Sequence, residues 1–130
     1  MSDRKLPQTT PPARRWRGRA LMAIAAGHTL VGLMEFPQVL AALLADGLFN
    51  TIGRDPLRAT AAWFLLFGAV LYLLGAAIDH LERSPNPAPY PHLGVGLLLL
   101  IAVGALLMPV SGFWLAIPPA LSLLNPTRKT

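Results

Sequence analysis

Three long stretches of this 130-residue sequence are almost free of formal charge, and they limit what the chain can fold into. Ala20–Ala45 contains one acid, Glu35, whereas Ala59–Ile78 and the 35 residues of Leu93–Thr127 contain none. A helix needs about 20 apolar residues to cross the hydrocarbon of a bilayer. Each stretch is therefore long enough to cross a membrane at least once.

Composition points the same way. Charged residues make up 13% of the chain and hydrophobic residues 54%, whereas an average soluble domain has roughly 25% charged residues. A soluble core of this size cannot bury so much apolar surface. We therefore predict an all-α, multi-pass protein of the inner (cytoplasmic) membrane. Its four predicted transmembrane helices lie at about 17–45 with a kink at Pro37, 57–81, 93–107 and 111–124.

Prolines set the boundaries of these predicted helices. Pro37 removes a backbone donor and should kink or end the first helix. The sequence leaves open whether residues 38–52 continue that helix or form a separate segment at the outer interface. The last apolar stretch is interrupted at residues 108–112, which predicts a hairpin, and Pro118 and Pro119 are expected to bend its second arm.

Two glycines in the second predicted helix indicate how it packs. Gly68 and Gly75 are seven residues apart and share one face of the helix. Small residues on one face allow the backbone of a neighbouring helix to approach closely. We therefore expect another helix to lie against this face.

The basic residues indicate the orientation, because nine of the eleven lie on one predicted side of the membrane. Six precede the first apolar stretch, Arg83 follows the second helix, and Arg128 and Lys129 lie near the chain end. Flanks rich in Lys and Arg stay in the cytoplasm, so both termini are predicted inside. The expected divisions are a disordered basic tail at 1–14, a four-helix transmembrane domain at 15–125 and a cytoplasmic tail at 126–130.

Several kinds of chemistry are not supported by the sequence. The chain has no cysteine, which excludes disulfides and thiolate sites. Its three histidines, His28, His80 and His92, show no metal-ligand spacing, so no metal site and no cofactor are predicted. The net charge of +5 lies at membrane flanks rather than on a folded basic surface, so no nucleic-acid partner is predicted.

Ionisable residues inside a predicted span are costly and therefore mark candidate functional residues. His28 and Glu35 are seven residues apart on the first predicted helix and lie on nearly the same side, with Gly32 between them. Arg54 and Arg58 are the basic residues expected on the outer side with Glu35. An ion pair between Glu35 and one of these arginines is the expected contact.

Two interpretations of this pair are open. In the functional one, His28 and Glu35 line a polar pocket open to the outer side and contact a ligand or exchange a proton. In the structural one, His28 bonds a neighbouring helix and Glu35 pairs with Arg58 to fix the register. Asn50, Arg54 and Trp63 are further candidates for ligand contact. A solvated helix end at the cytoplasmic surface is expected for Asp79, His80, Glu82 and Arg83.

Several segments resemble an uncharacterised bacterial family of small four-helix integral membrane proteins with no assigned function. These segments are Gly27–Leu33, Asp46–Thr51, Ala62–Phe64 and Met108–Trp114. The resemblance covers about residues 15–125. It implies the four-helix architecture, names no activity, and draws attention to His28, Asn50, Arg58 and Trp63.

Two looser likenesses suggest activities. A membrane bundle with His and Glu inside resembles the sterol isomerase and ligand-binding superfamily, although the paired acids of that family are missing here. Four helices with one Glu in the first also look like small multidrug transporters that work as dimers, although the surrounding motif is absent.

Three functions are therefore open at this point. The chain binds a small apolar or lipid-like ligand, forms a dimeric proton-coupled transporter subunit, or packs against a partner membrane protein as an accessory subunit. The predicted partners are the lipid bilayer, a small apolar ligand and a second copy of the chain. The sequence carries no catalytic motif, so an enzyme is not favoured, and acid/base chemistry by His28 and Glu35 is the minority interpretation.

Overall fold

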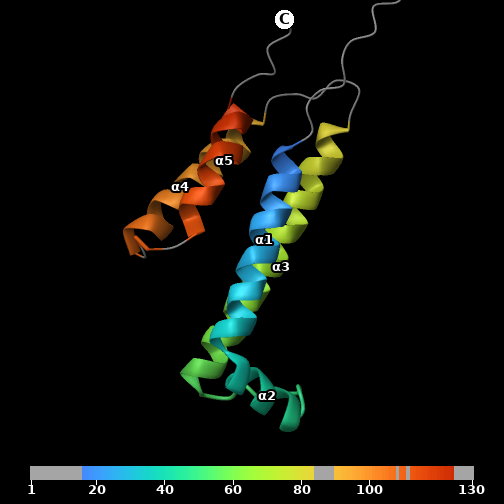
Figure 1. Ribbon diagram of the computed structural model, residues 1–130, viewed down its shortest axis with the longest axis vertical. Helices are drawn as coiled ribbons and strands as arrows, with labels where there is room; N and C mark the ends of the chain where they lie inside the picture. Colours follow the sequence, from blue (N-terminus) through green and yellow to red (C-terminus); the bar gives the residue numbers. More distant parts are fainter. Residues whose placement is uncertain (1–15, 84–89, 108, 111, 125–130) are drawn as a thin grey trace, which may run out of the picture.

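The computed structural model describes residues 16–83, 90–107, 109–110 and 112–124. Within these ranges every regular element is a helix (Figure 1), which confirms the all-α prediction. The predicted tails, 1–14 and 126–130, lie outside the described ranges. The elements are α1 (Arg17–Glu35), α2 (Pro37–Ala45), α3 (Pro56–Glu82), α4 (Pro91–Leu107), the 3₁₀ helix η1 (Gly112–Ala116) and α5 (Ile117–Leu124).

Two helical hairpins pack side by side. The long helices α1 and α3 form one antiparallel pair, α4 packs against α5 in the other, and η1 and α5 contact α1. The α4/α5 hairpin ends well short of the far end of the α1/α3 pair (Figure 1). Leucine, isoleucine and alanine side chains from both hairpins form the shared core: Leu21, Ala25, Leu71, Ile78, Leu97, Ile101, Ala116, Ala120 and Leu123.

Glycine allows α1 and α3 to touch backbone to backbone. A Cβ added at Gly75 would lie 2.8 Å from the amide N of Met22 and 2.9 Å from the carbonyl O of Gly18. One added at Gly68 would lie 2.6 Å from Oγ1 of Thr29. Because Gly68 and Gly75 both face α1, the predicted close approach of a neighbouring helix is confirmed.

The first predicted helix, 17–45, is corrected to two helices. Phe36 leaves the helical conformation, with φ −119° and ψ 34°, and Pro37 begins α2, a position where its missing N–H costs no hydrogen bond. The axis turns by 78° between α1 and α2. Such a turn is too sharp for a proline kink within one helix. Residues 37–45 therefore form a separate segment, which is one of the two possibilities that the sequence left open.

The predicted fourth helix, 111–124, is also corrected. Residues 112–116 form the 3₁₀ helix η1, and the α-helix begins only at Ile117. Pro118 and Pro119 therefore lie in the first turn of α5, where the backbone amides have no partner in the helix. The prolines mark the start of an α-helix rather than a bend within one.

One helix in the described part of the chain, α3, is long and apolar enough to cross a membrane. Only 28% of its most apolar window is buried within the described structure. The pair α1 and α2 would count as a second crossing if the bent pair is one span. The other apolar helices are shorter, and four transmembrane helices are not confirmed.

The glycine contact predicts opposite effects for two alanine substitutions. Gly75→Ala should lower the free energy of unfolding by about 1 to 3 kcal/mol, because the new methyl group meets backbone atoms that cannot move aside. Gly27→Ala should leave it unchanged or raise it by up to about 1 kcal/mol, because open space surrounds Gly27 and alanine favours a helix. Unfolding in detergent measures both, and equal effects would contradict the packing.

Candidate functional site

His28 holds α1 against α3. Its Nε2 lies 3.0 Å from the carbonyl O of Phe64, and because a carbonyl only accepts, Nε2 carries the proton and donates. The imidazole stacks on the Phe64 ring with centroids 3.9 Å apart and meets the edge of Phe67 at 5.5 Å. His28 therefore makes the contact of the structural interpretation, and a ligand role for it stays a prediction.

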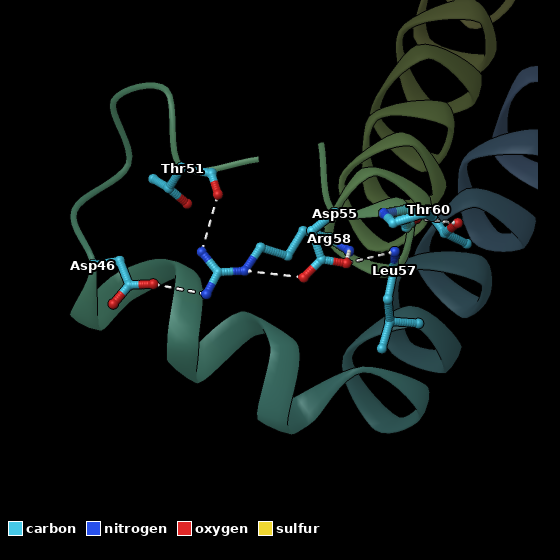
Figure 2. A network of polar contacts seen from close by, with 7 residues as sticks. Asp46, Thr51, Asp55, Leu57, Arg58 and Thr60 are labelled. Carbon is cyan, nitrogen blue, oxygen red and sulfur yellow. Dashed lines mark hydrogen bonds and ion pairs between the residues drawn. The ribbon is translucent and has the colours of Figure 1, made fainter. Parts of the chain in front are cut away.

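The expected ion pair between Glu35 and Arg58 is wrong. Glu35 is exposed at the end of α1 and forms no ion pair with any described residue. Nη2 of Arg58 lies 2.7 Å from Oδ2 of Asp46, and Nη1 donates to the carbonyl O of Thr51 at 2.9 Å (Figure 2). Glu35 and Arg58 therefore do not line one polar pocket with His28.

Arg58 instead fastens the loop between α2 and α3. Its Nε lies 3.5 Å from Oδ2 of Asp55, and Oδ1 of Asp55 caps α3 by accepting from the amides of Leu57 at 2.9 Å and Arg58 at 3.3 Å. Figure 2 shows the guanidinium between the two ends of this loop. Of the remaining candidates, Asn50 and Arg54 are exposed in this loop and Trp63 is exposed on α3.

The opposite end of the α1/α3 pair carries two buried acids, and the predicted solvated helix end is wrong for them. Asp79 is 5% exposed and Glu82 is 8% exposed, whereas His80 is exposed. Glu82 lies 3.7 Å from Nε of Arg17 and accepts from the amide of Gly18 at 3.4 Å. The carboxylate of Glu82 thus joins the two helices.

Asp79 binds two further arginines in the same place. Its Oδ1 lies 3.8 Å from Nε of Arg19, and its Oδ2 accepts from Nε of Arg83 at 3.1 Å. These contacts join five residues into a charge cluster: Arg17, Arg19, Asp79, Glu82 and Arg83.

A groove of about 580 Å³ runs between α1 and α3. Its described lining is nearly all apolar, with small residues from both helices, and within it only Thr29 and Tyr72 contribute hydroxyl groups. Neither hydroxyl forms a hydrogen bond with a described residue, and Tyr72 is 50% exposed. The lining residues are Ala25, Ala26, Thr29, Leu30, Leu33, Leu65, Gly68, Ala69, Tyr72 and Leu73.

A second hollow, of about 510 Å³, lies between α4 and the η1/α5 segment. The described lining residues contribute one polar side-chain group, the indole N–H of Trp114, which donates to the carbonyl O of Pro109 at 2.9 Å. The described lining of this hollow therefore offers no unpaired polar side-chain group to a ligand. Its lining residues are Leu98, Ile101, Ala102, Ala105, Leu106, Trp114 and Ile117.

The polar residues singled out from the sequence thus differ from those in the groove. Thr29 adjoins His28 in the chain, and Tyr72 lies within the uncharged stretch 59–78. Tyrosine is enriched at membrane surfaces rather than at mid-depth. The position of Tyr72 inside an uncharged stretch is therefore the sequence signal that could have marked it as a candidate. Among the described residues, no group of three or more His, Asp or Glu could hold a metal ion.

Fold and site together define an all-helical protein of two packed hairpins with an apolar groove along the longer one. Residues 12–130 match a family of unknown function, DUF6463, and the chain belongs to this family. The resemblance to an uncharacterised family is thereby confirmed. No curated protein and no solved structure matches the chain.

Two matched substitutions separate the buried acid from the exposed one. Glu82→Gln should lower the free energy of unfolding by about 3 kcal/mol, because it leaves the largely buried guanidinium of Arg17 without its counter-charge. Glu35→Gln should change it by less than about 0.5 kcal/mol, as expected for an exposed residue that has no ion-pair partner among the described residues. Chemical denaturation in detergent compares them, and a larger effect for Glu35→Gln would refute this assignment.

Proposed function

We propose that this chain is an integral membrane protein and that lipid covers the exposed apolar surface of its helices. The support comes from α3, in which no formal charge occurs between Arg58 and Asp79. At about 1.5 Å per residue the intervening stretch, 59–78, is about 30 Å long, which equals the thickness of the bilayer hydrocarbon. The Arg58 network and the charge cluster would then lie at opposite membrane surfaces.

The exposed side chains support the same setting. Large apolar residues on all of the longer helices are more than half exposed, whereas soluble monomers rarely expose apolar patches larger than a few hundred Å². In a bilayer such side chains contact acyl chains and carry no penalty. Examples are Met34, Leu66, Val70, Leu73, Leu99, Val103 and Leu106.

The proposed orientation follows the basic residues. The charge cluster contains three arginines, so its end of the molecule faces the cytoplasm. At the other end α2 turns by 78° from α1 and exposes Leu44, which suits a helix lying along the outer surface. The 17 residues of α4 are about 25 Å long, so α4 crosses with local thinning of the bilayer.

Within this setting, the function that the geometry supports best is binding of an elongated apolar molecule with one hydrogen-bonding group. The hydroxyl of Tyr72 carries the argument, because it lines the groove within the uncharged stretch of α3 and has no partner among the described residues. A polar group in hydrocarbon is costly unless it is hydrogen-bonded. A ligand hydroxyl or carbonyl would satisfy it, with Thr29 as a second contact.

The size of the groove agrees with this proposal. Its volume of about 580 Å³ falls within the roughly 300 to 1,000 Å³ of small-molecule sites. Alanines and glycine line it together with bulkier residues, which leaves room for a chain of methylene groups. The ligand-binding hypothesis is therefore kept, with its polar contacts moved from His28 and Glu35 to Thr29 and Tyr72.

The membrane location makes a direct prediction. Expressed full-length chain should sediment with membranes, stay there through high-salt and alkaline washing, and enter solution only with detergent. Apolar burial in lipid resists both washes, whereas a peripheral, charge-bound protein is released by them. A monomer that remains dissolved in buffer without detergent would contradict the location.

The groove is tested with a photoreactive diazirine-bearing long-chain alcohol on detergent-solubilised protein. Ala69→Trp should abolish most labelling by filling the groove, and Tyr72→Phe should weaken it about fivefold, the effect of one lost hydrogen bond. Ala77→Trp is the matched control, because Ala77 is exposed on the same helix but does not line the groove.

Labelled peptides from the wild-type protein should map to α1 and α3. Unchanged labelling in both Ala69→Trp and Tyr72→Phe would show that the alcohol does not occupy the groove. Equal loss in Ala69→Trp and Ala77→Trp would show that bulk on α3, rather than occupation of the groove, causes the effect.

A further inference from the structure

Three residues of the charge cluster, Arg19, Asp79 and Arg83, lie on the same side of the α1/α3 pair as the groove. On α1 a continuous stripe, with alternating steps of three and four residues, runs from Arg19 to Leu33. Such steps keep side chains on one helix face. Thr29 and Leu33 of this stripe line the groove. The full stripe is Arg19, Met22, Ala26, Thr29 and Leu33.

The facing helix repeats the arrangement. A stripe of α3 with the same steps runs from Arg83 through Asp79, Ala76 and Tyr72 to Ala69. Asp79 contacts both Arg19 and Arg83, so the two stripes meet at their charged ends. Arg19 and Arg83 therefore lie beyond the cytoplasmic end of the groove, with Met22 and Ala76 between them and the nearest lining residues of the two stripes.

Among the described residues, these two guanidinium groups carry more positive charge than their shared carboxylate neutralises. Arg17 is matched by Glu82, which leaves Arg19 and Arg83 to share Asp79. Two guanidinium groups offer about ten N–H donors, whereas one carboxylate offers about four acceptor positions. The side chain of Arg19 is 69% exposed and that of Arg83 is 56% exposed, so donors remain accessible from the membrane surface.

The depth of this pair matches the headgroup region of a bilayer. Asp79 follows the uncharged stretch of α3 directly, and Trp16, which is 37% exposed, precedes α1 as aromatic residues do at the headgroup level. Ten residues of α1 separate Arg19 from Thr29, a distance of about 15 Å along the axis. A molecule spanning both would need a charged head and a long apolar chain.

We propose that the groove binds a single anionic phospholipid, with its phosphate on Arg19 and Arg83 and one acyl chain lying past Thr29 and Tyr72. Guanidinium groups bind phosphate through paired charge-assisted hydrogen bonds. Asp79, which is 5% exposed, is a positioning residue that holds both guanidinium groups through its ion pairs with them. This assignment rests on the proposed function and names the ligand class of the same groove.

The test compares phosphatidic acid with diacylglycerol, which has the same acyl chains and no phosphate. In neutral detergent, phosphatidic acid should bind wild-type protein about tenfold more tightly than diacylglycerol, the effect of one charge-assisted hydrogen bond. It should also displace the photoreactive alcohol from the groove. Inorganic phosphate without an acyl chain should not displace it.

Arg19→Gln should remove the preference for phosphatidic acid, and Arg19→Lys should restore part of it. Labelling by the uncharged alcohol should stay at the wild-type level in Arg19→Gln, which shows that the groove is intact. Arg54→Gln is the control, because Arg54 is an exposed arginine at the other end of the pair, and it should keep the preference.

Three outcomes would overturn the phospholipid assignment: unchanged preference in Arg19→Gln, equal loss in Arg19→Gln and Arg54→Gln, or binding of phosphatidic acid without displacement of the alcohol. Wild-type protein that the alcohol never labels in the groove would instead refute the proposed function.

Discussion

The contact of the α1 and α3 backbones is the constraint on which the rest of the structure depends. Gly18 of α1 faces Gly75 of α3 so closely that neither position has room for a methyl group. One consequence is electrostatic, because the approach places the carboxylate of Glu82 at the amide of Gly18. The other is steric, because the alanine and glycine residues beside the contact are small and leave space for the groove. The close contact of the two backbones therefore accounts for both the charge cluster and the groove.

The sequence alone predicts the elements whose signals are local. The bounds of α3 and α4 follow from uncharged stretches flanked by proline, and the packing faces of Gly68 and Gly75 follow from their spacing. Features set by distant parts of the chain were not accessible in this way. Pro37 alone does not distinguish a kink from the observed 78° turn before α2, and the burial of Asp79 depends on α1, about 60 residues earlier in the chain.

The candidate site shows the same limit. Searching for charge inside an apolar stretch finds His28 and Glu35, yet the structure uses His28 between helices and leaves Glu35 exposed. Hydroxyl groups are weaker signals, since Thr29 and Tyr72 are ordinary residues in many helices. They become informative only when the fold places both on one groove and leaves both without a partner among the described residues.

The unequal length of the two hairpins has a mechanical consequence. The α4/α5 hairpin lies beside the N-terminal part of α1 and ends before the α1/α3 pair does (Figure 1). In the proposed orientation the bilayer is therefore thinner beside the α4/α5 hairpin than beside the α1/α3 pair. A protein that matches thin bilayer on one side and thicker bilayer on the other would collect at borders between membrane regions of different thickness.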